Sequence, residues 1–154
     1  MNKSILLDFI DKLSMLPRVI LQAHDFPDHD AVSSAYALSI LLKEKGIDSL
    51  IVYNGEIDRI SLSNLIMWLD IPIVHCSKAQ LTPMDKVITI DGCIGEANVT
   101  DITGEEIAVI DHHCVTPPKD LWFCDIRKNY GATATIICEY FQILNITMPE
   151  KVAT

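Results

Sequence analysis

The fold is set by residues 18–45, which read RVILQAHDFPDHDAVSSAYALSILLKEK. Residues 18–23 contain the apolar, β-branched run Val19-Ile20-Leu21, which predicts a buried strand. Pro27 prevents a helix from starting directly after this strand, and the two aspartates that follow it suit a helix start. Residues 31–45 then predict a helix, which Gly46 ends. The stretch is therefore a strand, a loop and a helix in that order.

The same alternation continues along the chain and predicts an α/β fold. We expect a mostly parallel, Rossmann-like sheet flanked by helices on both faces. Further strands are predicted at 49–53, 71–75, 86–90, 106–110 and 122–126, and further helices at 4–16, 61–69 and 131–144. No repeat, low-complexity tract or flexible linker divides the chain, so we expect one domain over residues 1–154.

Composition excludes several classes of protein. The formal charge of −9 argues against a broad basic surface for double-stranded nucleic acid. The odd number of five cysteines, without a C-x-x-C pair, fits neither a disulfide framework nor a zinc ribbon, so the expected compartment is reducing. No apolar stretch is long enough to span a bilayer, and we therefore expect a cytoplasmic protein without a membrane partner.

Acidic and histidine residues stand where three of the predicted strands end. They are His24, Asp28 and Asp30 after the first strand, Asp91 after residues 86–90, and Asp111, His112 and His113 after residues 106–110. Because the carboxyl ends of parallel strands meet at one edge of a sheet, these side chains are expected to converge there. Carboxylates crowded in this way would repel one another unless they were protonated or neutralised by a divalent cation.

Each of these segments also has an ordinary structural interpretation. An aspartate at a helix start, such as Asp28 or Asp30, is often only a cap. A lone His24 fits a hydrogen-bonded, partly buried histidine, the His112-His113 pair fits a turn, and Asp91 before a glycine fits a strand-to-turn junction. The coincidence of three such segments at three strand ends favours a metal site.

Imidazole and carboxylate ligands together suit Mn²⁺, Fe²⁺, Co²⁺ or Zn²⁺ better than Ca²⁺, and the excess of carboxylates favours Mn²⁺. Asp91 and His112 supply enough ligands for a second ion if Asp91 bridges the two. Paired metal ions can activate water and clamp both the attacking and the leaving oxygen of a phosphoryl displacement.

These motifs resemble the DHH phosphoesterase family, which includes RecJ-type exonucleases, oligonucleotide and cyclic-dinucleotide phosphodiesterases, and manganese inorganic pyrophosphatases. Residues 24–34, HDFPDHDAVSS, resemble the first family motif, and Ile90-Asp91 resembles the second. Asp111-His112-His113 is similar to the triplet that names the family. The resemblance covers nearly the whole chain.

The resemblance implies a role for each residue of the motifs. His24 and Asp28 would hold one Mn²⁺, Asp30 and His112 a second, and Asp91 would bridge them. His113 would contact the substrate phosphate as a catalytic group, and Asp111 would fix the orientation of a histidine. Gly131, Ala132 and Thr133 resemble a segment whose backbone N–H groups face a phosphate. The alternative for these small residues is close packing of their helix.

The chain also departs from the family pattern. Family members carry one more metal-binding aspartate beyond the helix that follows the triplet, and then a separate substrate-binding domain. Neither is found before Thr154, so we expect the chain to be a truncated DHH domain that lacks the C-terminal domain. Asp125 lies too early in the chain to match the missing aspartate, and we interpret it as structural.

The leading functional hypothesis is a phosphodiesterase that acts on a small nucleotide or a short oligonucleotide with two Mn²⁺ ions. Pyrophosphate or polyphosphate hydrolysis is an alternative, and a non-catalytic nucleotide-binding module is another. The oligomeric state stays open, with a homodimer among the possibilities. Cys93 and Cys114 are interpreted as fillers rather than ligands. Trp68 and Trp122 are expected in the core, with base stacking as the alternative role.

Overall fold

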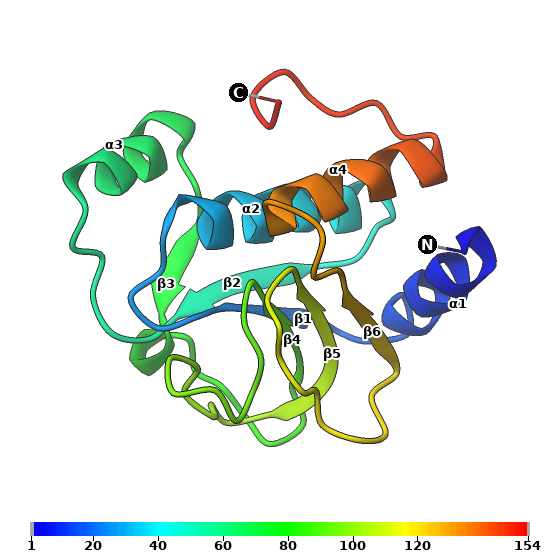
Figure 1. The fold of residues 1–154 in the computed structure, drawn as a ribbon, viewed down its shortest axis with the longest axis horizontal. Coiled ribbons are helices and arrows are strands. Elements are labelled where there is room, and N and C mark those ends of the chain that lie inside the picture. The colour runs from blue at the N-terminus through cyan, green and yellow to red at the C-terminus, as the bar shows by residue number, and fades with distance from the viewer. Residues whose placement is uncertain (1, 154) are drawn as a thin grey trace.

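The structure is a computed structural model that describes residues 2–153, so the predicted domain ends at Met1 and Thr154 lie outside the described residues. Helices and strands alternate through most of the chain (Figure 1). The helices are α1 (Lys3–Leu13), α2 (His29–Glu44), α3 (Ile60–Leu69) and α4 (Thr133–Leu144), with a short 3-10 helix η1 (Cys76–Lys78). The strands are β1 (Val19–Ala23), β2 (Ser49–Tyr53), β3 (Ile73–His75), β4 (Lys86–Ile90), β5 (Glu105–Asp111) and β6 (Phe123–Ile126).

The strands form one sheet in the order β3-β2-β1-β4-β5-β6, and every neighbouring pair is parallel. The chain builds outward from β1 to β3, then crosses back and builds in the other direction from β4 to β6. The reversal lies between β1 and β4, and the crevice at the carboxyl ends of such a strand pair is where open α/β sheets bind ligands. The predicted α/β fold class with a parallel sheet is confirmed.

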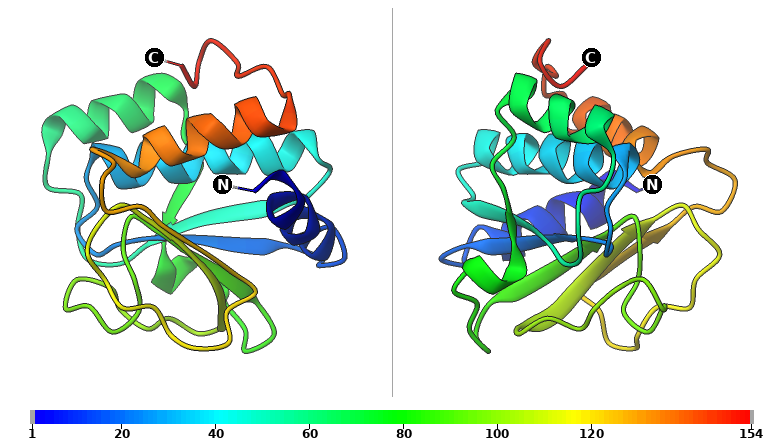
Figure 2. Two further views of the ribbon diagram at one scale, coloured as in Figure 1. Left: turned by 45° about the vertical axis from the view of Figure 1, so that its right-hand side comes forward. Right: turned by 90° about the vertical axis from the view of Figure 1, so that its left-hand side faces the viewer.

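The helices gather on one face of this sheet, which differs from the predicted arrangement on both faces. Buried residues of α1, α2 and α4 share one core with Leu21, Ile88 and Ile110 of the sheet. The opposite face carries a small apolar cluster around Ile20 and Val87, which is covered by η1 and by loops. Figure 2 shows α2, α3 and α4 together above the sheet.

Chain direction explains this asymmetry. Parallel crossovers are right-handed, so connections that run one way along the sheet cover one face and those that run back cover the other. The connections after β4 and β5 are short and contain glycines or the Pro117-Pro118 pair, so they form loops instead of helices. Helices α1 and α4, at the two ends of the chain, return to the helical face.

Several predicted boundaries and one predicted core residue differ from the structure. Helix α2 begins at His29, two residues earlier than expected, because Asp28 caps it, and α4 begins at Thr133 instead of Gly131. The Trp68 side chain is 73% exposed, so its placement in the core was wrong, whereas Trp122 packs partly buried against the core. Only Leu62 of α3 is fully buried among its described residues, which leaves the outer face of that helix apolar and open.

Candidate metal centre

The loop between β1 and α2 places two of the predicted ligands. His24 follows directly on β1, and Asp28 is the N-cap of α2. The Asp28 Oδ1 atom accepts the amides of Asp30 at 2.8 Å and Ala31 at 3.1 Å, so the cap interpretation holds for this residue. The same oxygen lies 4.0 Å from His24 Nε2. Capping therefore fixes the carboxylate beside the histidine instead of removing it from the site.

Asp91 lies at the end of β4, and its geometry is unusual. Its side chain is 3% exposed and its backbone adopts the left-handed conformation at φ 58°, which costs a non-glycine residue about 1–2 kcal/mol. Thr133 donates a hydroxyl hydrogen bond of 2.8 Å to its Oδ1 atom. A Cβ atom on the next residue, Gly92, would lie 2.8 Å from Val99 and 3.3 Å from the Cβ of His24. Glycine at position 92 thus lets the end of β4 approach the end of β1.

His24 and His112 each present the Nε2 atom of the ring to Asp91. The Nδ1 atom of His24 lies 2.8 Å from the carbonyl oxygen of Asp25, and the Nδ1 atom of His112 lies 3.0 Å from the carbonyl oxygen of Tyr130. A carbonyl can only accept, so Nδ1 carries the proton in both rings. In the tautomer with the proton on Nδ1, the Nε2 lone pair is free, which is the arrangement found in metal-binding histidines.

The two oxygens of Asp91 face different histidines. The distance from Oδ2 to His24 Nε2 is 3.8 Å, and the distance from Oδ1 to His112 Nε2 is 3.5 Å. These separations are too long for hydrogen bonds. Lone pairs and carboxylate oxygens that face one another at this range match donor atoms grouped around a cation. One carboxylate thus stands between two groups of donors.

Those groups satisfy the donor chemistry of a transition-metal site. His24, Asp28 and Asp91 offer one set of ligand atoms within 4.8 Å of one another, and Asp91, His112 and His113 offer a second. Mixed imidazole and carboxylate donors suit Mn²⁺ and its neighbours in the first transition series. The residues present therefore fit the metal that the sequence predicts, and all five lie in segments that follow three separate strands.

Asp30 joins the site through α4. Its Oδ2 atom lies 3.7 Å from His112 Nε2, and its carboxylate accepts the amides of Thr133 at 2.8 Å and Ala134 at 2.9 Å. These are the free amides at the start of α4. The Thr133 amide was predicted to face a phosphate, but here it binds Asp30. Ala132 is the N-cap of α4, and the predicted roles of Gly131 and Ala132 in substrate binding stay predictions.

Asp111 holds His113 in place. The Asp111 Oδ1 atom lies 2.8 Å from His113 Nδ1 and accepts the His113 amide at 3.1 Å. The Asp111 side chain is fully buried, whereas that of His113 is about half exposed. Burial lowers the pKa of His113, but the hydrogen bond to Asp111 and the charges of Asp111, Asp91 and Asp30 outweigh burial and raise it overall. The predicted orienting role of Asp111 thus has a specific partner.

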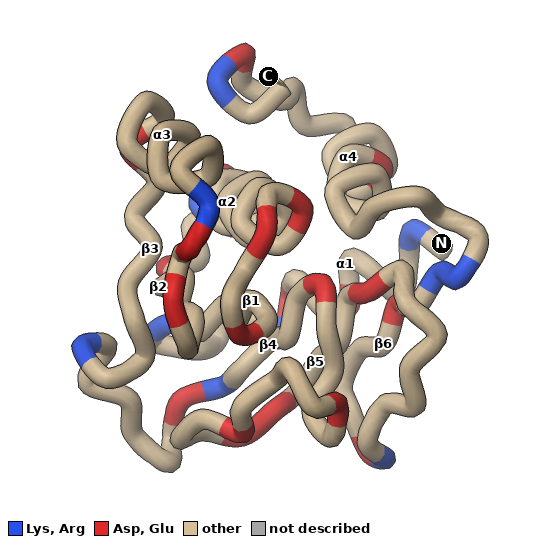
Figure 3. Tube along the Cα trace, turned by 60° about the vertical axis from the view of Figure 1, so that its left-hand side comes forward, with Lys and Arg blue, Asp and Glu red and all other residues tan. Residues whose placement is uncertain are grey.

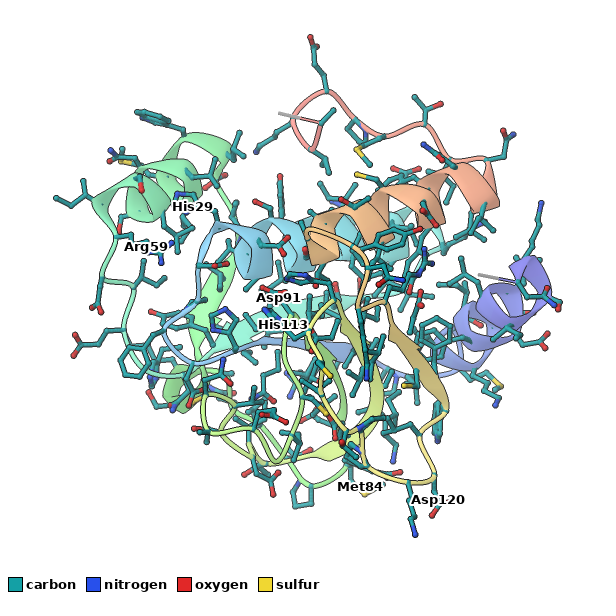
Figure 4. All side chains as sticks on the ribbon, in the orientation of Figure 1. His29, Arg59, Met84, Asp91, His113 and Asp120 are labelled. Carbon is teal, nitrogen blue, oxygen red and sulfur yellow. The ribbon has the colours of Figure 1, made fainter. Side chains whose placement is uncertain are left out.

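The site is electrostatically unbalanced. Every ion pair described for His24, Asp91, His112 or His113 joins a histidine to an aspartate, and none contains Lys or Arg. Burial, followed by the nearby charge of Asp30, raises the pKa of Asp91 to about 6. Figure 3 shows acidic positions gathered at the start of α2 and beside the carboxyl ends of β4 and β5. Asp91 and His113 lie together below the starts of α2 and α4 (Figure 4).

A pocket of about 210 Å³ opens beside Asp91 and His113. Asp91, Asp111 and His113 line one part of it, and Glu96 and Asn98 line another. Cys114 also borders the pocket and is exposed, whereas Cys93 is fully buried. Burial raises the pKa of Cys93 to about 11, which keeps the thiol protonated at neutral pH. The filler interpretation fits Cys93 but not Cys114.

Sequence reasoning missed three supports of the site. The Thr133 hydroxyl binds Asp91, the Tyr130 carbonyl binds His112, and Asp25 connects its own loop to the loop before β5. A backbone carbonyl leaves no residue-type signal, and the two side chains lie far in sequence from the groups they bind. Asp125, interpreted as structural, is buried and binds Arg127 and Tyr140 instead of the metal centre.

The chain matches the sequence model of a known family over residues 18–154, with the description "DHH family, N-terminal domain". An uncharacterized protein of Methanocaldococcus jannaschii is 31% identical over 138 residues, which cover 88% of this chain and 28% of that protein. A probable manganese-dependent inorganic pyrophosphatase of Enterococcus faecalis is 27% identical over 143 residues, covering 90% of this chain and 45% of the enzyme. Pyrophosphatases of the same description from Bacillus cereus match equally.

The fold is shared with a solved structure. The crystal structure of an exopolyphosphatase-related protein from Bacteroides fragilis superposes with a TM-score of 0.69 at 16% identity, covering 99% of this chain and 47% of that one. The chain therefore spans less than half the length of these relatives. The expectation of a further domain after Thr154 stays a prediction.

Proposed function

The chain belongs to the DHH family, and from that membership we propose that it forms the metal-binding part of a metal-dependent phosphoester hydrolase. One observation carries the proposal: the two oxygens of the buried Asp91 face the free Nε2 atoms of two different histidines. Two divalent ions of the manganese type would supply water activation and neutralise charge on a phosphate. The manganese-dependent relatives support this choice of metal.

The residues of the chain would each contribute a defined part. His24 and Asp28 would hold one ion, Asp30 and His112 the other, and Asp91 would contact both. The hydrogen bonds from Nδ1 of the two histidines to backbone carbonyls keep Nε2 available as a ligand atom.

His113 would contact the substrate, because it borders the pocket and exposes about half of its side chain. Its Nδ1–H donates to Asp111, so Nε2 is the atom available to a phosphate oxygen. The raised pKa of His113 favours the protonated ring, which can stabilise charge on the phosphate or donate a proton to the leaving oxygen.

For the substrate we propose a phosphodiester of a short oligonucleotide or a related nucleotide. Hydrolysis of pyrophosphate or polyphosphate is the second candidate, because pyrophosphatases are among the relatives of the chain. The RecJ-like description, nucleic-acid binding and a cytoplasmic location remain predictions. No helix within residues 2–153 has the length and apolar character needed to cross a membrane.

The test compares Mn²⁺-dependent hydrolysis of bis(p-nitrophenyl) phosphate and of pyrophosphate. It uses this chain and, where the encoded protein continues past Thr154, the longer protein as well. The proposal expects hydrolysis of at least one substrate that stops on chelation and returns with Mn²⁺. A protein that binds a nucleotide but hydrolyses neither substrate and takes up no manganese would instead be a binding module.

A further inference from the structure

Phe26 is an exposed aromatic residue inside the loop that carries two of the ligands. It lies between His24 and Asp28, and its side chain is 60% exposed. The other large apolar side chains that are exposed within residues 2–153 lie on or next to α1, on α3, or before β4: Ile5, Met15, Ile60, Met67, Trp68 and Met84. Phe26 is therefore the exposed apolar side chain that covalent connection places beside the metal centre.

The ring of Phe26 is fixed in this position. The Phe26 backbone has φ 52°, a left-handed conformation that a bulky residue rarely adopts. Its amide donates a hydrogen bond of 3.2 Å to the carbonyl of Asn54. A Cβ atom on Gly55 would lie 3.2 Å from two ring carbons, so glycine at that position makes room for the ring. The ring is thus held at the surface by its own backbone and by the segment after β2.

The loop that bears Phe26 is also anchored on its other side. The Asp25 amide donates to the carbonyl of Asn98 at 2.7 Å, and the Asp25 carboxylate accepts the Thr100 hydroxyl at 2.6 Å. The Asn54 side-chain amide donates to the Thr100 hydroxyl at 2.9 Å and to the Asp25 carboxylate at 3.4 Å. A surface that is ordered before a ligand arrives loses less conformational entropy on binding.

A positive group lies on the same side of the site. Arg59 follows Gly55 by four residues and precedes α3, and it is exposed. The other two arginines of the chain form ion pairs with Asp85 and Asp125, whereas no ion pair of Arg59 is found within residues 2–153. In the view of Figure 4, Arg59 and His29, which begins α2, lie on the same side of Asp91. The Phe26 ring thus lies against the segment between β2 and α3, which carries Arg59 together with Glu56 and Asp58.

We propose that Phe26 is a specificity-determining residue that stacks on a nucleobase of the substrate while the phosphate lies at the metal centre. This inference rests on the proposed hydrolase function and deepens it. Aromatic side chains stack on any base, which gives affinity without strong sequence preference. Pyrophosphate has no base, so Phe26 would favour nucleotide esters over that substrate.

The experiment uses the Mn²⁺-loaded protein and its Phe26→Ala and Phe26→Trp variants. It measures AMP binding by calorimetry and the hydrolysis of the dinucleotide pApA and of pyrophosphate. For Phe26→Ala we expect AMP binding to weaken and the KM for pApA to rise by about 10- to 100-fold. Pyrophosphate hydrolysis should stay unchanged, and Phe26→Trp should behave like the wild type. Trp68→Ala removes an aromatic side chain that is 73% exposed on α3 and serves as the matched control.

A second variant tests the position of the ring without removing it. Gly55→Ala should displace the Phe26 ring. It should therefore weaken AMP binding and raise the KM for pApA, and leave pyrophosphate hydrolysis unchanged. The inference is overturned if Phe26→Ala changes both substrates equally, changes neither, or leaves AMP binding intact. It is also overturned if the wild type binds AMP no more tightly than inorganic phosphate. If the wild type hydrolyses neither substrate but AMP binding still depends on Phe26, the hydrolase proposal fails and the stacking surface stands.

Discussion

Two groups of charged side chains contact α4, and they are balanced differently. The charge-matched cluster consists of Asp125, Arg127, Tyr130, Glu139 and Tyr140. The metal centre consists of His24, Asp28, Asp30, Asp91 and His112. Both groups contain carboxylates shielded from solvent, but only the first contains an arginine.

In the charge-matched cluster the chain supplies its own positive charge. Arg127 binds both oxygens of Asp125 at 2.9 Å and also pairs with Glu139. The Tyr140 hydroxyl donates to Asp125 at 2.7 Å, and the Tyr130 hydroxyl donates to Glu139 at 2.5 Å. These hydrogen bonds lower the pKa of Glu139 and raise that of Arg127 above its already high value. The ionised forms of Glu139 and Arg127 are thus the stable ones in this cluster.

In the metal centre the chain leaves negative charge uncompensated. Burial raises the pKa of Asp91 to about 6, because this carboxylate has no arginine or lysine beside it and lies near Asp30. The comparison shows that burial of an aspartate alone does not mark a site. What marks the site is a buried carboxylate that no arginine or lysine of the described chain pairs with.

The largest effect on activity is expected when the uncompensated negative charge of the metal centre is removed. Asp91→Asn should lower Mn²⁺-dependent hydrolysis by about 1,000-fold or more, because one residue would serve both groups of donors. Circular dichroism should show an unchanged fold. Steady-state kinetics with the wild-type protein as reference tests this prediction, and near-normal turnover would remove Asp91 from the mechanism.

Arg127→Met should have the largest effect on stability. The substitution leaves the buried Asp125 carboxylate without its positive partner, which costs about 3–5 kcal/mol of unfolding free energy. Lys128→Met, at the exposed neighbouring position, is the control and should change stability by less than about 0.5 kcal/mol. Urea denaturation measures both. An equal effect of the two substitutions would show that the cluster is not balanced by Arg127.

Asp91→Asn should stabilise the metal-free protein, in contrast to its effect on activity. A carboxylate whose pKa rises from 3.8 to about 6 on folding destabilises the native state above pH 6 and has no such effect below pH 4. The substitution should raise the free energy of unfolding by up to about 3 kcal/mol at pH 7. Denaturation in the presence of a chelator at pH 4 and pH 7 checks it. A variant less stable than the wild type at pH 7 would contradict the uncompensated charge.

The ion pair of Arg18 and Asp85 should make stability depend on pH in the opposite direction, with a smaller effect. Hydrogen bonds from Arg18 at 2.6 and 2.8 Å lower the pKa of Asp85 from 3.8 to about 2. This pair therefore adds about 2 kcal/mol of stability above pH 4, which is lost as the pH falls towards 2. Asp85→Asn should be destabilised at pH 6 and equal to the wild type near pH 2. Asp11→Asn, at an exposed position of α1, should follow the wild type at both values.

The sequence was sufficient to predict the parallel sheet and the three strand ends that converge. Hydrophobic runs followed by His24, Asp91 and the 111–113 triplet specify both, because side chains at the carboxyl ends of parallel strands must share one edge. The same pattern could not predict which face the helices cover, since that depends on the direction of each crossover. It also could not predict that Trp68 is exposed, because an apolar helix sequence does not say how much of the helix finds a partner.

Details of the site were beyond the sequence for a related reason. The orientation of His112 depends on a carbonyl at Tyr130, and the Asp91 carboxylate is held by Thr133, 42 positions along the chain. Neither contact follows from spacing or residue type. The left-handed conformations of Phe26 and Asp91 likewise depend on the tertiary contacts of their loops.

Anomalous diffraction at the manganese edge, from crystals grown with Mn²⁺, tests the central claim most directly. The account predicts manganese peaks in contact with Asp91, one beside His24 and Asp28 and the other beside His112. Crystals that contain manganese only at other positions, or none next to Asp91, would contradict it.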